Sequence, residues 1–72
     1  MSPDDIKALK KEASTRKRLA SDIASKIHDL VEDRYWTEFN DLPALAAEAI
    51  AACEAWQAAQ TAYEQAAASE TA

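Results

Sequence analysis

The sequence predicts an all-α protein, a two-helix antiparallel hairpin that homodimerises into a four-helix bundle. Glycine is absent and there are only two prolines among 72 residues, so the chain has little turn chemistry for a many-stranded fold. Apolar residues recur at alternating steps of three and four in two long stretches, which is the spacing of one helix face. The chain is also too short to form a stable hydrophobic core comfortably by itself. Pairing two hairpins covers the apolar flanks that one hairpin leaves exposed to solvent.

The first helix is predicted over residues 3–34. Ser2 before Pro3, with Asp5 three residues after the serine, is typical of a capped helix start. The seam that follows has one polar exception, Arg16, whose aliphatic stem can lie along the seam while its guanidinium reaches water. The apolar seam residues are Ile6, Leu9, Ala13, Ala20, Ile23, Ile27 and Leu30. The residues that widen this stripe to the face of a bundle helix are Leu19, Ala24 and Val31.

The period is lost over residues 35–41, which predicts a turn. Asp41 is expected to cap a second helix over residues 42–67, with Pro43 tolerated in its first turn. Bulky and small residues alternate along the second seam, which allows close helix packing. That seam consists of Leu42, Leu45, Ala49, Ala52, Trp56, Ala59, Tyr63 and Ala66. The tail, residues 68–72, is expected to fray.

Charge is distributed unevenly along the chain. All eight basic residues lie within the first 34, whereas residues 35–72 hold six acids and no base, and the net charge is −5. In an antiparallel hairpin the basic start of the first helix lies beside Glu64 and Glu70, which favours this register modestly. The acidic total makes the chain a poor generic nucleic-acid binder.

Several function classes are excluded or disfavoured. No nucleophile–base–orienter set, phosphate-binding loop or paired-cysteine motif is present, so we expect no enzyme. No apolar run is long enough for a membrane span, and no basic-then-apolar signal segment opens the chain. The single cysteine, Cys53, lies beside the second seam and is expected to be a small buried hydrophobe; ligation of a metal across a dimer is the alternative. A cytoplasmic protein is therefore expected.

His28 and Glu32 are the first candidates for chemistry. They lie four residues apart and share one helix face, with Asp29 in the neighbouring row. An imidazole nitrogen with a carboxylate oxygen one turn away is half of a site for a divalent transition metal, and a second chain or water would have to complete it. The alternative is a solvated surface pair.

Three of the five aromatic residues, Tyr35, Trp36 and Phe39, lie together at the turn. One interpretation is a plug that covers the open end of the bundle core. The other is a docking patch, because exposed aromatic residues are typical anchors for a protein partner.

Lys7, Lys11 and Arg18 form a basic strip on the outer face of the first helix. A solvated face with pairing to nearby carboxylates is one interpretation, and RNA binding by a helical dimer is the other.

These features resemble a small Rop-like family encoded among nitrogen-fixation genes. The segment that carries the resemblance is Ile27-His28-Asp29-Leu30-Val31-Glu32-Asp33, together with the lysine-rich first helix, a tryptophan in the turn and Leu42-Pro43 opening an alanine-rich helix. The similarity runs from about Leu9 to Tyr63. The lysine-free second helix and Arg34-Tyr35-Trp36 at the start of the turn depart from the family pattern.

The resemblance implies a hairpin that dimerises into a four-helix bundle, and a metalloprotein linked to nitrogenase assembly or function. It implies His28 as a metal ligand, with Glu32 and then Asp29 as further candidates. The expected function is a non-enzymatic accessory protein that docks on a nitrogenase structural or assembly component. A metal carrier or sensor and a Rop-like RNA-binding dimer are the alternatives.

Overall fold

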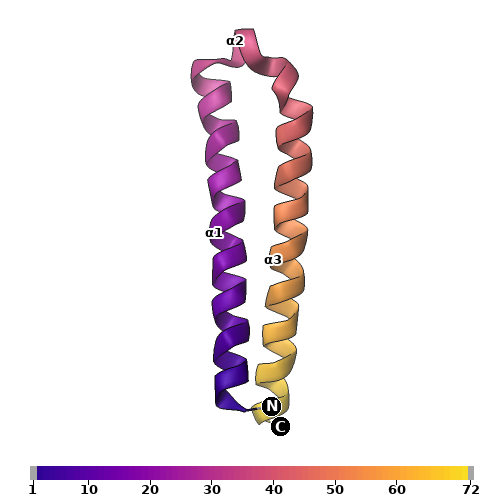
Figure 1. The fold of residues 1–72 in the computed structure, drawn as a ribbon. Coiled ribbons are helices and arrows are strands. Elements are labelled where there is room, and N and C mark those ends of the chain that lie inside the picture. Colours follow the sequence, from indigo (N-terminus) through magenta and orange to yellow (C-terminus); the bar gives the residue numbers. More distant parts are fainter. Residues whose placement is uncertain (1, 72) are drawn as a thin grey trace.

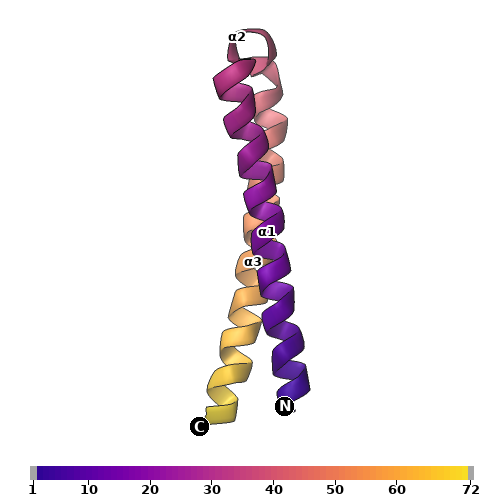
Figure 2. The same ribbon diagram turned by 90° about the vertical axis from the view of Figure 1, so that its left-hand side faces the viewer.

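Two long helices run antiparallel and are joined by a short helical turn, so the predicted hairpin is confirmed (Figure 1). The computed structural model describes the backbone of residues 2–71 and the side chains of residues 2–69. The two helices cross at a shallow angle, as the side view shows (Figure 2), and the termini lie at the same end of the rod (Figure 1). In chain order the elements are α1 (Pro3–Asp33), α2 (Tyr35–Glu38), the 3-10 turn η1 (Phe39–Asp41) and α3 (Leu42–Thr71).

Helix α1 begins with the predicted cap. The backbone N–H of Asp5 donates to Ser2 Oγ at 3.3 Å, and the backbone N–H of Ser2 donates to Asp5 Oδ2 at 3.4 Å. Pro3 occupies the first helical position, where its missing N–H costs nothing. This reciprocal pair is a capping box, and it fixes where α1 starts.

The turn is more regular than the sequence indicates. Residues 35–41 form α2 and η1 instead of an irregular loop. No hydrogen bond joins the Asp41 side chain to the first turn of α3 among the residues described, so the expected cap is absent. Instead Asp41 ends η1, and the N–H of Leu42 donates to the carbonyl of Phe39. The backbone of η1 thus leads directly into α3.

Helix α3 extends beyond its predicted end at residue 67 and reaches Thr71. Ala66, Ala67 and Ala68 are strong helix formers, and no glycine or proline follows to stop the helix. The backbone of residues 68–71, which were expected to fray, is helical. Residue 72, the last of that predicted tail, lies outside the described part of the chain.

The two predicted seams face each other. Every seam position of α3 is buried or half-buried, and so is every apolar seam position of α1. Arg16, the polar exception, is exposed and its Nε lies 2.8 Å from Glu12 Oε1. Grooves between the helices are lined jointly by Ala13 and Tyr63, by Ala20 and Trp56, and by Ile23 and Ala52. Residues that lie level on the two helices therefore have numbers that add to about 75.

This hairpin buries very little on its own. Among the described residues only Ala13, Leu30 and Ala66 are buried, with 4%, 3% and 7% of their surface exposed. The accessible surface is 5406 Å², whereas a compact monomer of 7.9 kDa is expected to expose about 4,400 Å². The excess of about 1,000 Å² per chain is close to the roughly 800 Å² that each partner buries in a standard protein interface. The hairpin is a thin rod with extents of 53 × 15 × 13 Å, a shape that leaves a large share of its surface exposed.

Within residues 2–71, no helix combines the length and apolarity needed to cross a lipid bilayer.

Candidate functional site at the turn end of the hairpin

His28 and Glu32 lie together on the outer face of the last turns of α1, as their spacing predicts. His28 Nδ1 is 3.4 Å from Glu32 Oε2, and it is 3.9 Å from Asp29 Oδ1. The side chain of His28 is 73% exposed and those of both carboxylates are 64% exposed. The three predicted metal ligands are therefore neighbours, and all of them are open to solvent.

The donor set of one chain is incomplete for a metal ion. Among the described residues, no group of three or more histidine, cysteine, aspartate or glutamate side chains is arranged to hold one. The same imidazole nitrogen, Nδ1, faces both carboxylates, and it can bind a metal only when it carries no proton. A divalent transition metal at His28 would need further ligands from water or from a second chain.

The three aromatic residues of the turn are exposed. Trp36 is 86% exposed, Phe39 49% and Tyr35 38%. The rings of Tyr35 and Trp36 meet edge to face, with centroids 5.3 Å apart and an interplanar angle of 73°. Trp36 therefore does not cover the core of the hairpin, so the plug interpretation does not describe it. Instead, its ring is held against Tyr35 and presented to solvent.

The backbone around these rings is held by Arg34. Its N–H donates to the carbonyl of Leu30 at 2.9 Å, and its carbonyl accepts from the hydroxyl of Thr37 at 3.3 Å. The Nε of Arg34 lies 2.6 Å from Glu38 Oε2, an ion pair that the spacing of four residues could have predicted. The short helix α2 is thus anchored to the end of α1, which orients the aromatic residues.

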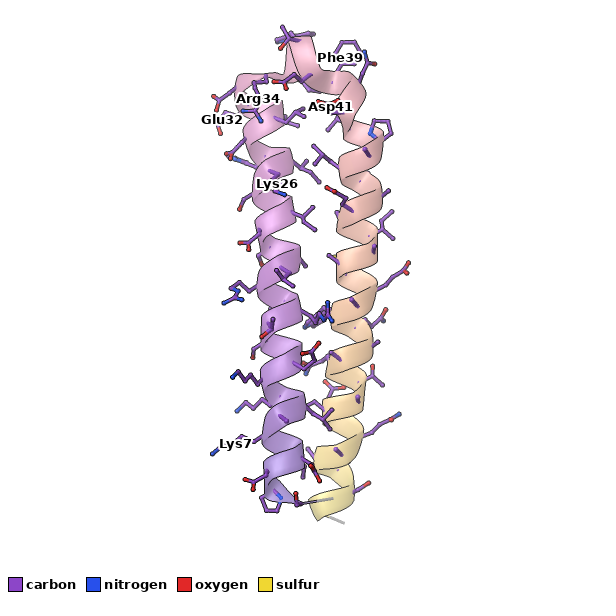
Figure 3. The ribbon with its side chains drawn as sticks, in the orientation of Figure 1. Lys7, Lys26, Glu32, Arg34, Phe39 and Asp41 are labelled. Atoms are coloured by element: carbon purple, nitrogen blue, oxygen red, sulfur yellow. The ribbon has the colours of Figure 1, made fainter. Side chains whose placement is uncertain are left out.

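Carboxylates are concentrated at the end of α1, just before the aromatic residues in the chain. The last turn of α1 contains no basic residue, and Asp29, Glu32 and Asp33 lie at its C-terminal end. Negative charge is unfavourable there, because the helix dipole already places partial negative charge at that end. Figure 3 shows Glu32, Arg34, Phe39 and Asp41 at the turn end and Lys7 pointing outward near the other end. A cation or a basic surface would relieve the repulsion at the turn.

Cys53 is exposed, so its expected burial is wrong for the hairpin taken alone. It lies on the flank of α3 rather than on the seam, in a shallow groove of about 430 Å³. The residues of this groove are Ala49, Ile50, Cys53, Glu54, Trp56 and Gln57. Ile50 is 59% exposed and Val31 of α1 is 48% exposed. Both residues lie beside the seam, where an apolar residue stays exposed in a single hairpin.

The basic strip residues Lys7, Lys11 and Arg18 are exposed, in keeping with either of their predicted roles. Two further lysines, Lys10 and Lys17, line a groove of about 250 Å³ on the flank that carries Cys53. The other residues of that groove are Ala13, Ser14, Trp56, Gln60 and Tyr63.

Fold and surface together define a helical hairpin with an uncovered apolar flank and an exposed aromatic turn. A family model described as Rop-like matches residues 4–68. The chain therefore belongs to the Rop-like family. Among curated proteins and among solved structures, none matches this chain.

Proposed function

We propose that this protein is a non-enzymatic accessory factor whose aromatic turn docks on another protein. The observation that supports this most is Trp36, which is 86% exposed yet oriented by its contact with Tyr35. Tryptophan and tyrosine are enriched among the residues that dominate binding energy at interfaces. An exposed indole gains roughly 1.5–3 kcal/mol or more when a partner buries it.

The chemistry of the docking partner follows from the carboxylates around the turn. Asp29, Glu32 and Asp33 present negative charge next to the aromatic residues, and Arg34 is paired with Glu38. A partner with an apolar pocket for the indole and a basic rim complements this surface.

The identity of the partner is proposed from the resemblance to a family encoded among nitrogen-fixation genes. On that ground we propose a nitrogenase structural or assembly component as the docking target and the cytoplasm as the compartment. This step depends on family analogy, whereas the location of the docking surface depends on the exposure of Trp36.

Affinity capture from nitrogen-fixing cells tests both parts. The wild-type chain is expected to recover a nitrogenase component, and Trp36→Ala is expected to lose at least about 30-fold in affinity, the effect of removing an interface hot spot. Lys7→Ala, at the opposite end of the rod, is the matched control and should bind like the wild type. Recovery of no nitrogenase component would remove the proposed target, and equal binding by Trp36→Ala would remove the proposed surface.

Metal carriage or sensing is the second candidate, favoured by His28 Nδ1 lying 3.4 Å from Glu32 Oε2. Titration with Zn²⁺ tests it, comparing the wild type with His28→Ala and with Glu54→Ala, a carboxylate far from the pair. Loss of affinity in His28→Ala alone would support a carrier, whereas unchanged affinity would remove this candidate.

We also propose that the protein acts as a homodimer. The support is the excess surface of about 1,000 Å² over a compact monomer and the burial of only three small or medium side chains among those described. A second hairpin would complete a four-helix bundle.

A further inference from the structure

A groove of about 450 Å³ runs between α1 and α3 on the flank opposite Cys53. Its floor is apolar and combines two aliphatic side chains of α1 with two alanines of α3. These residues are Leu19, Ile23, Ala52 and Ala55. Leu19 is 41% exposed and the other three are half-buried, so the floor is accessible from solvent. Small side chains on the α3 side allow another backbone to approach closely.

Charged side chains line the rim of this groove with alternating sign. Arg16 and Lys26 lie ten residues apart on α1, one at each end of the apolar floor, and Asp22 lies between them. At about 1.5 Å per residue, the two cations are about 15 Å apart along the helix. The rim is therefore positive, then negative, then positive over about three turns of α1.

Two of these three charges are not paired within the hairpin. Among the described residues, neither Asp22 nor Lys26 takes part in an ion pair or a side-chain hydrogen bond. Arg16 uses its Nε on Glu12 at 2.8 Å, which leaves the terminal N–H groups of its guanidinium for another acceptor. The groove thus offers charge of both signs beside an apolar floor.

A second copy of this chain does not complement this rim. If α1 of another copy lay in the groove in the opposite direction, Arg16 would come level with Lys26 of that copy. In the same direction each cation would come level with its own counterpart. Like charges meet in both arrangements, which disfavours them. Helix α3 of another copy contains no basic residue that could face Asp22.

We propose that this groove binds one amphipathic helix of a different protein. The apolar stripe of that helix covers Leu19 and Ile23, as in other complexes in which a helix fills a groove. Two acidic residues about ten positions apart face Arg16 and Lys26, and a basic residue between them faces Asp22. A small anion or an acyl chain would meet only one of the three charges, whereas a helix with the same rise per residue meets all of them.

This site is separate from the proposed docking turn. Trp36 lies ten residues beyond Lys26, in α2 at the end of the rod. The inference goes beyond the proposed function, because neither the turn nor its partner enters it. Trp36→Ala should therefore bind a helical peptide in the groove as the wild type does. Loss of peptide affinity in that variant would move the site to the turn and overturn the proposal.

Two synthetic peptides test the charge pattern. Both are alanine-rich helices of about 20 residues with the same leucine stripe, because shorter helices are marginal in water. The acidic-ended peptide carries two glutamates about ten positions apart with a lysine between them, and the basic-ended peptide carries two lysines with a glutamate between them. Fluorescence anisotropy at about 0.15 M NaCl is expected to show the acidic-ended peptide bound at least about fivefold more tightly.

The net charge of the chain makes this comparison decisive. At −5, overall attraction alone would favour the basic-ended peptide. A preference for the acidic-ended peptide therefore reports the local rim rather than the whole chain. Equal affinities, or a preference for the basic-ended peptide, would overturn the proposal.

Charge reversal at Lys26 locates the site. Lys26→Glu is expected to weaken the acidic-ended peptide about fivefold or more and to strengthen the basic-ended one, whose lysine then meets a carboxylate. Lys7→Glu is the matched control, because Lys7 is exposed near the open end of the rod and outside the groove. It should change both affinities less than about twofold. Equal effects of the two variants would contradict binding in the groove.

Two aliphatic residues on opposite flanks test the floor. Leu19 is 41% exposed and Ile50 is 59% exposed, so the helices should form in both Leu19→Asn and Ile50→Asn. Leu19→Asn should weaken the acidic-ended peptide at least about tenfold and Ile50→Asn less than about threefold. The reverse pattern would assign the peptide to the other flank. Analytical ultracentrifugation of both variants completes the test: a fall in molar mass in Leu19→Asn alone would show that a second copy covers this groove, and would overturn the proposal.

Discussion

The chain has two tryptophans in contrasting surroundings. Replacing Trp56 by alanine should lower the stability of the fold, whereas replacing the proposed docking residue Trp36 should change stability little. Trp36 is 86% exposed, so folding removes only about 35 Å² of an indole residue of roughly 250 Å² from water. At about 25 cal/mol per Å², this burial is worth about 1 kcal/mol. Trp56 is half-buried on the α3 seam and contributes to three of the grooves between and beside the helices. Its truncation is expected to cost about 2–3 kcal/mol, below the 3–5 kcal/mol of a fully buried tryptophan.

Thermal unfolding followed by far-UV circular dichroism, at one fixed chain concentration, measures this difference. Trp56→Ala should lower Tm by roughly 10–20 °C, and Trp36→Ala by no more than about 8 °C, given about 4–8 °C per kcal/mol for a domain of this size. Fixed concentration matters because the Tm of a dimer depends on it. Equal losses of Tm in the two variants would refute the assignment of Trp36 to a surface role.

Three further results are expected. Ser2→Ala removes the capping box of α1 and should lower the free energy of unfolding by about 1 kcal/mol in chemical denaturation, with Ser69→Ala near the far end of α3 as the control. Leu30→Ala, at a side chain with 3% exposure, should cost about 2–4 kcal/mol in the same assay; a cost below about 1 kcal/mol would show that α1 does not pack there. The wild-type chain should shift no RNA in a gel at low salt, because its net charge is −5; a salt-sensitive shift lost on replacing the basic strip would restore the RNA-binding alternative.

The fold could be predicted because the two seams leave little choice of structure. Seven apolar positions in α1 and eight in α3 follow the helical period, and Ser2, Pro3 and Asp5 form the cap that their spacing indicates. The turn was harder to predict. The apolar period is lost over residues 35–41 and does not indicate their helical structure; the sequence signal there is the spacing of Arg34 and Glu38, whose side chains form an ion pair of 2.6 Å.

The candidate site could be predicted in part. Spacing along one helix predicts that His28 and Glu32 are neighbours, and they lie 3.4 Å apart. Spacing along one helix cannot show whether a second chain supplies a third metal ligand, because that depends on how the chains pack. The same reason explains Cys53, which was expected to be buried on a flank that a single hairpin leaves open. The sequence of one chain says least about the burial and the ligands of residues whose surroundings depend on a second molecule.

The molar mass in solution tests the central claim that one hairpin is half of a working bundle. The protein should be purified without a metal-affinity step and measured by light scattering, with metal analysis before and after chelation. The account predicts about 16 kDa, twice the 7.9 kDa chain, in both states. A mass of 7.9 kDa at high concentration would contradict it, and a dimer that forms only with bound metal would place His28, rather than the apolar flank around Cys53, at the interface.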